Sequence, residues 1–253
     1  MMNPTQAIAG VRDSVCAIMR IHEGTKTPRK GKGKGQPSSR QFGVSFAGTG
    51  WCIVADRYVV TAHHILNDMK ARLPKDKFVV FTAPGNGNRA YHFPVKGFVV
   101  EDPSSDLAIL ELGPAATAGQ HIPAVPVTFA RPPDGSRVLT FGFPAPVIQS
   151  VSLDRKGDYV AGRSKFLLKG HANEGIVAAQ YDFGPDWAFE FNVAWHHGES
   201  GGPIFLHQPL AAFAVMQLYR NVESPHGVVA GPHVGRSLAA IQGQLASCGA
   251  TVV

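Results

Sequence analysis

One stretch of the sequence carries a serine in a setting where it could act as a nucleophile. Ser200 lies in HGESGGPIF (197–205), between glycines and just before Pro203 and an apolar run. A serine hydroxyl is a weak nucleophile until a base takes its proton. The glycines let the backbone turn sharply and bring N–H groups close to a reacting carbonyl. Because Ser-Gly-Gly is also ordinary loop composition, the stretch indicates catalysis only if the chain supplies a base and an acid as well.

Candidate bases and acids lie in the first half of the chain. The apolar run 58–62 ends in the pair His63 and His64. A histidine that follows a buried strand is held rigidly enough to act as a base, although lone histidines are often structural. Asp106 stands where a loop meets the apolar run LAIL, and Asp102 precedes it among turn-forming residues. An acid at such a junction either caps a turn or fixes a partner.

Together these residues would form a Ser-His-Asp constellation. With His64 as the base, Ser200 Oγ attacks a carbonyl carbon while the imidazole takes, and later returns, the proton. Asp106 would fix the imidazole tautomer and stabilise the imidazolium. The backbone N–H groups of Gly198 and Ser200 would converge on the developing oxyanion. This chemistry needs no cofactor and no metal, so neither is expected.

The elements that must position these residues are mostly short strands. Residues 113–124 have linker composition and divide the chain into an N-terminal part, 1–112, and a C-terminal part, 125–253. Each part has about six strand-like segments separated by turns, the first of them at 11–21. Only 236–247 has apolar residues at helical spacing. The pattern predicts an all-β fold of barrels or sandwiches with one C-terminal helix.

The net charge of +6 has a local origin. Six basic residues and no acid lie within 25–40, and the rest of the chain has equal numbers of basic and acidic residues. We expect a mobile loop at 22–41, inserted in a hairpin. A basic loop can contact nucleic acid, but no aromatic residues are interleaved for base stacking, so a solvated loop is favoured.

Three blocks of the sequence resemble a known family. VVTAHH (59–64), DLAIL (106–110) and GESGGP (198–203) resemble the signature blocks of chymotrypsin-fold (trypsin-like) serine proteases. GTGWCIV (48–54) and the C-terminal half look most like the bacterial Deg/HtrA branch, here without a PDZ domain. The resemblance implies two perpendicular six-stranded antiparallel β-barrels with the active site in the cleft between them. It also favours His64 over His63, and Asp106 over Asp102.

The sequence departs from the secreted digestive branch of this family. It has no Ile-Val-Gly-Gly-like activation sequence, and Ile65 stands where that branch has a cysteine. Glu199 stands where the family often keeps an acid linked to activation, so its partner is an open question. By resemblance, Ala194 and Trp195 would lie at the base and wall of the primary substrate pocket. Without an acid there, the pocket predicts a small or apolar P1 side chain.

The resemblance also implies that Ala214, Val215 and Met216 form the edge that pairs with the substrate backbone. Trp195 could equally be an ordinary residue of the hydrophobic core.

The G-x-S-x-G pattern around Ser200 fits an α/β-hydrolase elbow as well. That fold needs its acid and histidine after the serine, and a strand-like run follows Pro203, so it is disfavoured. The histidine pairs at 63–64 and 196–197 do not predict a metal site, because adjacent side chains on a strand point to opposite faces.

The sequence therefore predicts a serine endopeptidase whose partner is a polypeptide substrate. The alternative is a catalytically silent or activator-dependent peptide-binding module, whose basic loop docks a partner protein or nucleic acid. A cytoplasmic location is expected because no signal peptide or long apolar run is present. The odd number of cysteines, at unpatterned spacing, also suits a reducing compartment better than a disulfide framework.

Overall fold

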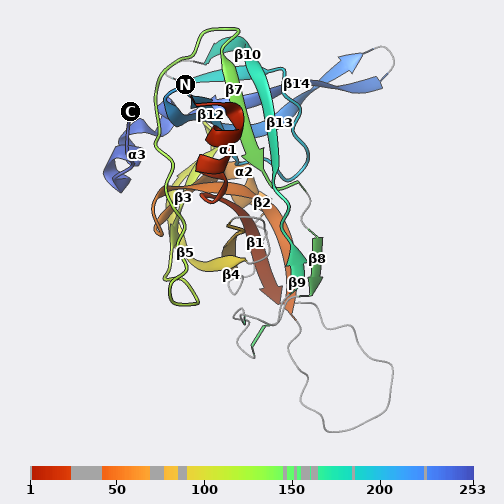
Figure 1. Ribbon diagram of the computed structural model, residues 1–253. Coiled ribbons are helices and arrows are strands. Elements are labelled where there is room, and N and C mark those ends of the chain that lie inside the picture. The colour runs from red at the N-terminus through yellow and green to blue at the C-terminus, as the bar shows by residue number, and fades with distance from the viewer. Residues whose placement is uncertain are drawn as a thin grey trace.

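The structure, a computed structural model, consists mainly of two closed barrels of antiparallel strands. It describes residues 2–23, 42–68, 77–84, 90–144, 147–150, 153–154, 160, 165–183, 186–224 and 227–253. The basic segment at 25–40, which sequence analysis places in a mobile loop, lies outside these residues. Figure 1 shows the strands of one barrel in the lower part of the molecule and those of the other above them.

The first barrel has the strand order β1-β2-β3-β6-β5-β4. Its third strand shows why these residues form sheet: all five residues of YVVTA are buried, and β-branched and aromatic side chains pack well on a pleated surface. The strands are β1 (Val15–Glu23), β2 (Phe42–Val54), β3 (Tyr58–Ala62), β4 (Lys77–Thr82), β5 (Tyr91–Asp102) and β6 (Leu107–Leu112).

The second barrel has the strand order β10-β11-β14-β13-β12-β7, and β8 (Val147–Ser150) and β9 (Lys165–Leu167) form a separate two-stranded sheet. Its strands are β7 (Arg137–Gly142), β10 (His171–Phe183), β11 (Asp186–Phe191), β12 (Pro203–His207), β13 (Leu210–Ser224) and β14 (Gly227–Ser237). The predicted all-β fold with two six-stranded barrels is thus confirmed. The predicted linker, 113–124, forms part of the longer stretch 113–136 between β6 and β7.

The structure corrects the sequence analysis at the N-terminus. The expected strand at 11–21 begins only at Val15, because residues up to Arg12 form the helix α1 (Pro4–Arg12). Asn3 caps this helix: its side chain accepts from the N–H of Gln6, and the Gln6 side chain accepts from the N–H of Asn3. The helix thus takes up residues 11 and 12, the first two residues of the stretch whose alternation predicted a strand.

Two further α-helices, α2 and α3, are described, and a 3₁₀ helix precedes the second of them. α2 (His63–Asp68) begins directly after β3, so the histidine pair starts a helix rather than ending a strand. At the C-terminus, Ser237 caps a 3₁₀ helix (Leu238–Ile241) that runs into α3 (Gln242–Cys248). No helix among the described residues is long and apolar enough to cross a membrane.

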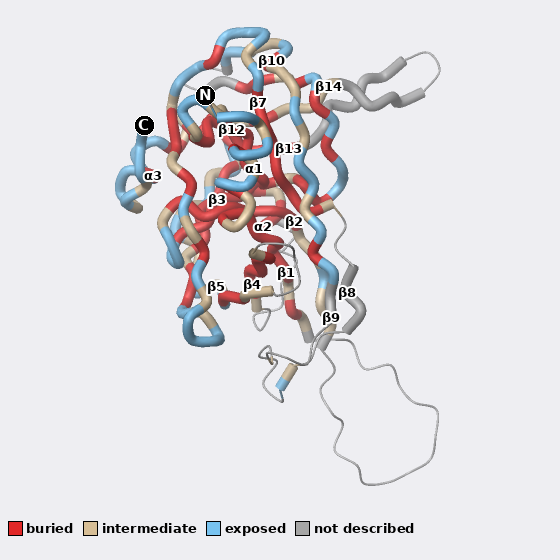
Figure 2. The backbone as a smooth tube through the Cα atoms, in the orientation of Figure 1, coloured by how far each residue is buried: buried red, intermediate tan, exposed pale blue. Residues whose placement is uncertain are grey.

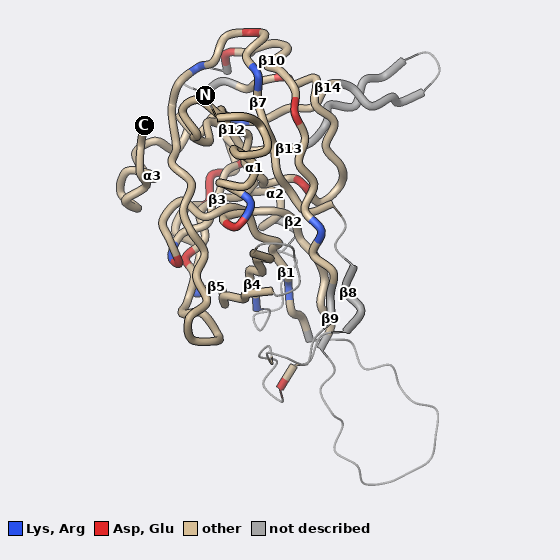
Figure 3. The backbone as a smooth tube through the Cα atoms, viewed as in Figure 1, with Lys and Arg blue, Asp and Glu red and all other residues tan. Residues whose placement is uncertain are grey.

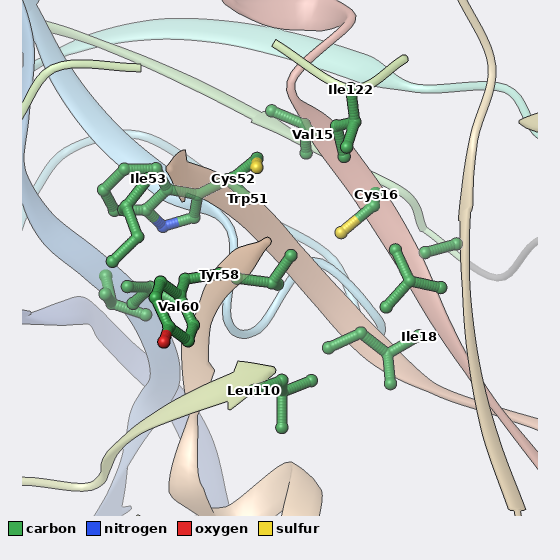
Figure 4. Packing of buried hydrophobic residues seen from close by; sticks show 14 of the residues in the cluster. Val15, Cys16, Ile18, Trp51, Cys52, Ile53, Tyr58, Val60, Leu110 and Ile122 are labelled. Atoms are coloured by element: carbon green, nitrogen blue, oxygen red, sulfur yellow. The ribbon is translucent and has the colours of Figure 1, made fainter. Parts of the chain in front are cut away.

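Buried residues lie along the strands of both barrels, and turns such as 55–57 are exposed (Figure 2). Cys16 and Cys52 lie in the core of the first barrel, close to Trp51 and Ile18 (Figure 4). Both are free thiols; burial raises the pKa of Cys16, and it raises that of Cys52 to about 12. Along the described backbone, charged residues are scattered and form no continuous stripe of one sign (Figure 3).

Candidate active site

Asp106 is held in a backbone conformation that aims its carboxylate at His64. It has φ 56°, in the left-handed region that only a few non-glycine residues adopt. Its carbonyl oxygen accepts the N–H of His63 at 3.0 Å, and its Oδ1 accepts the N–H of His64 at 2.6 Å. Oδ2 lies 2.8 Å from His64 Nδ1. The turn before β6 and the first turn of α2 are therefore joined by three hydrogen bonds.

This arrangement selects one tautomer of His64. A carboxylate oxygen can only accept, so the Nδ1 atom that faces Oδ2 carries a proton. The other ring nitrogen, Nε2, is then the basic one in the neutral imidazole. The side chains of His64 and Asp106 are only about 29% and 25% exposed, which strengthens the interaction between them relative to a surface pair. The pair has the geometry of a base and its orienting acid.

The neighbouring candidates, Asp102 and His63, have other contacts. Asp102 accepts hydrogen bonds from the N–H and hydroxyl groups of both Ser104 and Ser105, which is typical of a turn. Burial works to raise the pKa of Asp102, but these hydrogen bonds outweigh it and the pKa is lowered. His63 is buried, with Nε2 3.7 Å from Glu101 Oε2. Both residues support the turn and lie beside the His64–Asp106 pair.

Ser200 lies in a loop that packs against the first barrel. Its carbonyl oxygen accepts the N–H of Thr49 at 2.9 Å, which ties the loop to β2. Its hydroxyl donates to the backbone carbonyl oxygen of Gln217 at 2.9 Å. Among the described residues, no hydrogen bond joins Ser200 Oγ to His64. A net hydrogen bond contributes about 1 kcal/mol, so a turn of this one side chain toward His64 has a small cost.

The backbone around Ser200 depends on glycines. Gly198 and Gly201 have φ 101° and 87°, which strain any other residue. A Cβ on Gly201 would also lie 2.1 Å from the carbonyl oxygen of Thr49 and 2.3 Å from Thr61 Oγ1. The close approach of this loop to β2 therefore excludes a side chain at position 201.

Thr49 fixes the loop further, and sequence analysis did not single it out. Its buried hydroxyl donates to the carbonyl oxygen of Gly198 at 2.8 Å and accepts the N–H of Phe143 at 3.0 Å. Its own carbonyl oxygen accepts from Thr61 Oγ1 at 2.7 Å. The only sequence signal was its place inside the GTGW block. Thr49 thus connects β2, the end of β7 and the loop before Ser200.

Glu199 is held within its own loop, which answers the question that the sequence left open. Its N–H donates to the carbonyl oxygen of His196 at 3.0 Å, and its Oε2 accepts the N–H of His196. The side chain is fully buried, and Oε1 has no hydrogen-bond partner among the described residues. Burial raises the pKa of Glu199, against the His196 N–H and the charges of His196 and His171, which lower it.

The predicted substrate-binding residues occupy different environments. Ala194 is exposed, whereas Trp195 is 4% exposed and packs on the rings of Phe191 and His233 in the core of the second barrel. Residues 214–216 are fully buried. Val215, for example, pairs with residues of both β12 and β14. The assignment of substrate contacts to these residues stays a prediction, since most of their backbone groups already have partners.

Gln217 is a second residue that sequence analysis missed. It is 9% exposed, its carbonyl oxygen accepts from Ser200, and its side-chain amide donates to the carbonyl oxygen of Ser105 at 3.1 Å. It therefore touches both the serine loop and the turn that carries Asp106. No local pattern marks it, because both contacts are with residues far away in the sequence.

Comparisons with known proteins identify the family of the chain. The family model of the trypsin-like peptidase domain matches residues 48–209, which is more than half of the chain. No curated protein sequence matches the chain at a significant level.

Solved structures with a similar fold include the HtrA-type protease AlgW with a decapeptide. It has 16% sequence identity and a TM-score of 0.63, and the match covers 97% of this chain and 67% of that one. A substituted form of AlgW, also with a decapeptide, has 17% identity and a TM-score of 0.59, covering 99% and 68%. Deg5 has 14% identity and a TM-score of 0.58, covering 94% and 90%. The chain belongs to the trypsin-like peptidase family and is a serine protease with a fold like that of the HtrA-type proteases.

Proposed function

We propose that the chain is an endopeptidase that cleaves through an acyl-enzyme on Ser200, with His64 as the base and Asp106 as its orienting acid. The observation that carries the proposal is the Asp106 carboxylate, which accepts both the backbone N–H and the ring Nδ1 proton of His64. The serine loop is tied to the same barrel through Thr49. The proposal therefore takes its base and acid from the first barrel and its serine from a loop that is hydrogen-bonded to that barrel.

In the proposed reaction, Ser200 Oγ bonds to the carbonyl carbon of the substrate as its proton passes to His64 Nε2. The N–H groups of Gly198 and Ser200 stabilise the oxyanion, and Asp106 stabilises the imidazolium. The C–N bond then breaks as His64 returns the proton to the leaving amine. Water repeats the sequence on the acyl-enzyme, releases the acid and restores Ser200.

For the substrate, we propose a polypeptide with a small or apolar P1 side chain beside Ala194 and Trp195. Two of the similar structures hold a decapeptide, which supports a peptide as the ligand of this fold. We also propose that residues 214–216 form the edge that pairs with the backbone of the substrate. A peptide-library cleavage profile tests this assignment, and a preference for lysine or arginine at P1 would contradict it.

A fluorophosphonate probe, which phosphonylates activated serines, tests the reaction itself. We expect the probe to label the intact protein and to leave Ser200→Ala unlabelled. Ser247→Ala is a matched control, because Ser247 is exposed on α3 and its hydroxyl donates to the carbonyl oxygen of Gly243 at 2.9 Å. His64→Ala should reduce labelling by several orders of magnitude. Equal labelling of Ser200→Ala and the intact protein would refute the role of Ser200.

The second candidate function is an activator-dependent or silent peptide-binding module. It is favoured by one observation, the hydrogen bond from Ser200 Oγ to Gln217 in place of His64. If this hydrogen bond holds Ser200 inactive until a peptide binds, the probe will not label the protein alone but will label it once a binding peptide is added. Absence of labelling in both conditions, with peptide binding retained, would support the silent module.

A further inference from the structure

A buried amide side chain connects the two halves of the proposed active site without passing through the histidine. Gln217 lies on β13 where the pairing with β14 shifts register: Met216 pairs with Gly235 and Tyr219 with His233. Such a shift leaves one extra residue on β13, which turns the strand locally. The Gln217 side chain is thereby placed against the first barrel, with 9% of the residue exposed.

The contacts of Gln217 are divided between the nucleophile and the acid. Its backbone carbonyl oxygen accepts from Ser200 Oγ at 2.9 Å. Its Nε2 donates to the carbonyl oxygen of Ser105 at 3.1 Å and reaches that of Asp106 at 3.5 Å. Both acceptors lie in the turn between β5 and β6, so a residue of the second barrel holds the backbone of the acid-bearing turn in the first.

This turn needs support because Asp106 adopts a sparsely populated backbone conformation. A non-glycine residue at φ 56° persists only when its surroundings hold it there. On its outer side the turn is held by Asp102, which accepts from Ser104 and Ser105. On its inner side the support comes from Gln217. Without the amide, the carbonyl oxygen of fully buried Ser105 would lose a donor, and the peptide between Ser105 and Asp106 would be held less firmly.

We propose that Gln217 is a positioning residue of the catalytic centre: its amide holds the Ser105–Asp106 backbone so that the Asp106 carboxylate keeps its aim at His64. The inference rests on the proposed function, because it assigns Asp106 and His64 their roles. Gln217 itself exchanges no proton and touches no reacting atom through its side chain. Its effect is expected on the reactivity of Ser200 and on the basicity of His64.

The test compares Gln217→Met, which keeps the length of the side chain but cannot donate, with Gln180→Met. Gln180 is a suitable control because its amide also donates to a backbone carbonyl oxygen, that of Pro132 at 3.0 Å, and to Asp134 at 3.0 Å. Its acceptor atom binds Arg131. The control therefore removes comparable amide hydrogen bonds to a loop of the second barrel, and that loop carries no proposed catalytic residue.

The measurement is the rate of fluorophosphonate labelling as a function of pH, with unfolding followed in parallel. Gln217→Met should label roughly 10- to 100-fold more slowly at its optimum, the loss expected when a catalytic group is slightly misplaced. The midpoint of the acid limb should move to lower pH, because a poorly aimed Asp106 stabilises the imidazolium less. The other ionisable groups recorded beside the turn are Asp102, Glu101 and His63, and the substitution leaves all three in place.

The outcomes separate this inference from the proposed function. If intact protein and Gln180→Met label equally while folded Gln217→Met labels slowly with a shifted midpoint, the inference is supported. If folded Gln217→Met matches the intact protein in rate and midpoint, the inference is refuted and the proposed function stands. If the intact protein is never labelled, the proposed function fails and the inference with it. Should Gln217→Met not fold, the shorter Gln217→Asn replaces it with the same expectations.

Discussion

The substitution Thr49→Val would remove one hydroxyl and almost no volume from the support of the proposed oxyanion hole. The hydroxyl is fully buried and makes two hydrogen bonds, to the carbonyl oxygen of Gly198 and from the N–H of Phe143. Valine has the same branched shape, so packing is preserved while both backbone groups lose their partner. The variant therefore isolates the polar role of position 49.

The size of the effect follows from these two contacts. A buried polar backbone group left without a partner costs about 1–3 kcal/mol, so the free energy of unfolding should fall by about 2–6 kcal/mol. The carbonyl of Gly198 would also be free to move, and with it the N–H that we assign to the oxyanion. Complete loss of one oxyanion donor lowers kcat by roughly 10²–10³-fold, so a loosened donor should lower it by roughly 10- to 100-fold.

Chemical denaturation and fluorophosphonate labelling of the folded protein together measure both effects. Thr82→Val is the matched control, because Thr82 is equally buried but its hydroxyl donates to the carbonyl oxygen of Asp13, at 3.0 Å, and not to the loop that carries Ser200. It should lower stability by about 1–3 kcal/mol and leave labelling unchanged. If Thr49→Val is destabilised yet labels at the rate of the intact protein, Thr49 does not position Gly198 and the reasoning is refuted.

Three further outcomes are expected. Asp106→Asn should fold normally but label at least roughly 10³-fold more slowly, because an amide can present the wrong hydrogen-bonding group to His64; near-normal labelling would overturn its assignment. Gly201→Ala should lower the free energy of unfolding by about 3 kcal/mol or more, since its Cβ would meet the Thr49 carbonyl oxygen at 2.1 Å, and an unchanged denaturation midpoint would contradict this. The raised pKa of Glu199 means that its contribution to stability is fully present below the ordinary value of 4.5 and is lost as the pH rises through the folded-state value. Denaturation across this pH range should therefore show intact protein losing stability relative to Glu199→Gln, whereas parallel curves would show that Glu199 does not titrate this way.

Much of the fold could be predicted from local patterns. Strands such as YVVTA (58–62) are recognisable because burial, β-branching and the following turn act over neighbouring residues. The helix α1 was missed because its signal, the capping box of Asn3 and Gln6, lies before the alternating stretch 11–21 from which a strand was predicted. The histidine pair was placed at a strand end, but the chain turns into α2 at once.

Some residues of the candidate site could be predicted from the sequence and others could not. Ser200, His64 and Asp106 could be proposed because each lies in a short block whose residue types and order carry the signal. Thr49 and Gln217 could not, since their roles exist only after β2 and β13 are brought beside loops from distant parts of the chain. The partner of Glu199 was equally hidden, because it is the backbone N–H of His196 and depends on how the loop closes.

By itself, the sequence determined the residue types available for chemistry, their order along the chain and the strands that would carry them. These depend on side-chain chemistry and on preferences that act over a few residues. Only the tertiary structure decided that the Ser200 hydroxyl binds Gln217, that Thr49 binds Gly198 and that the Gln217 amide binds Ser105. The physical reason is that a hydrogen bond requires two groups within about 3 Å, and for distant residues that distance is set by barrel closure and strand register, which no short stretch encodes.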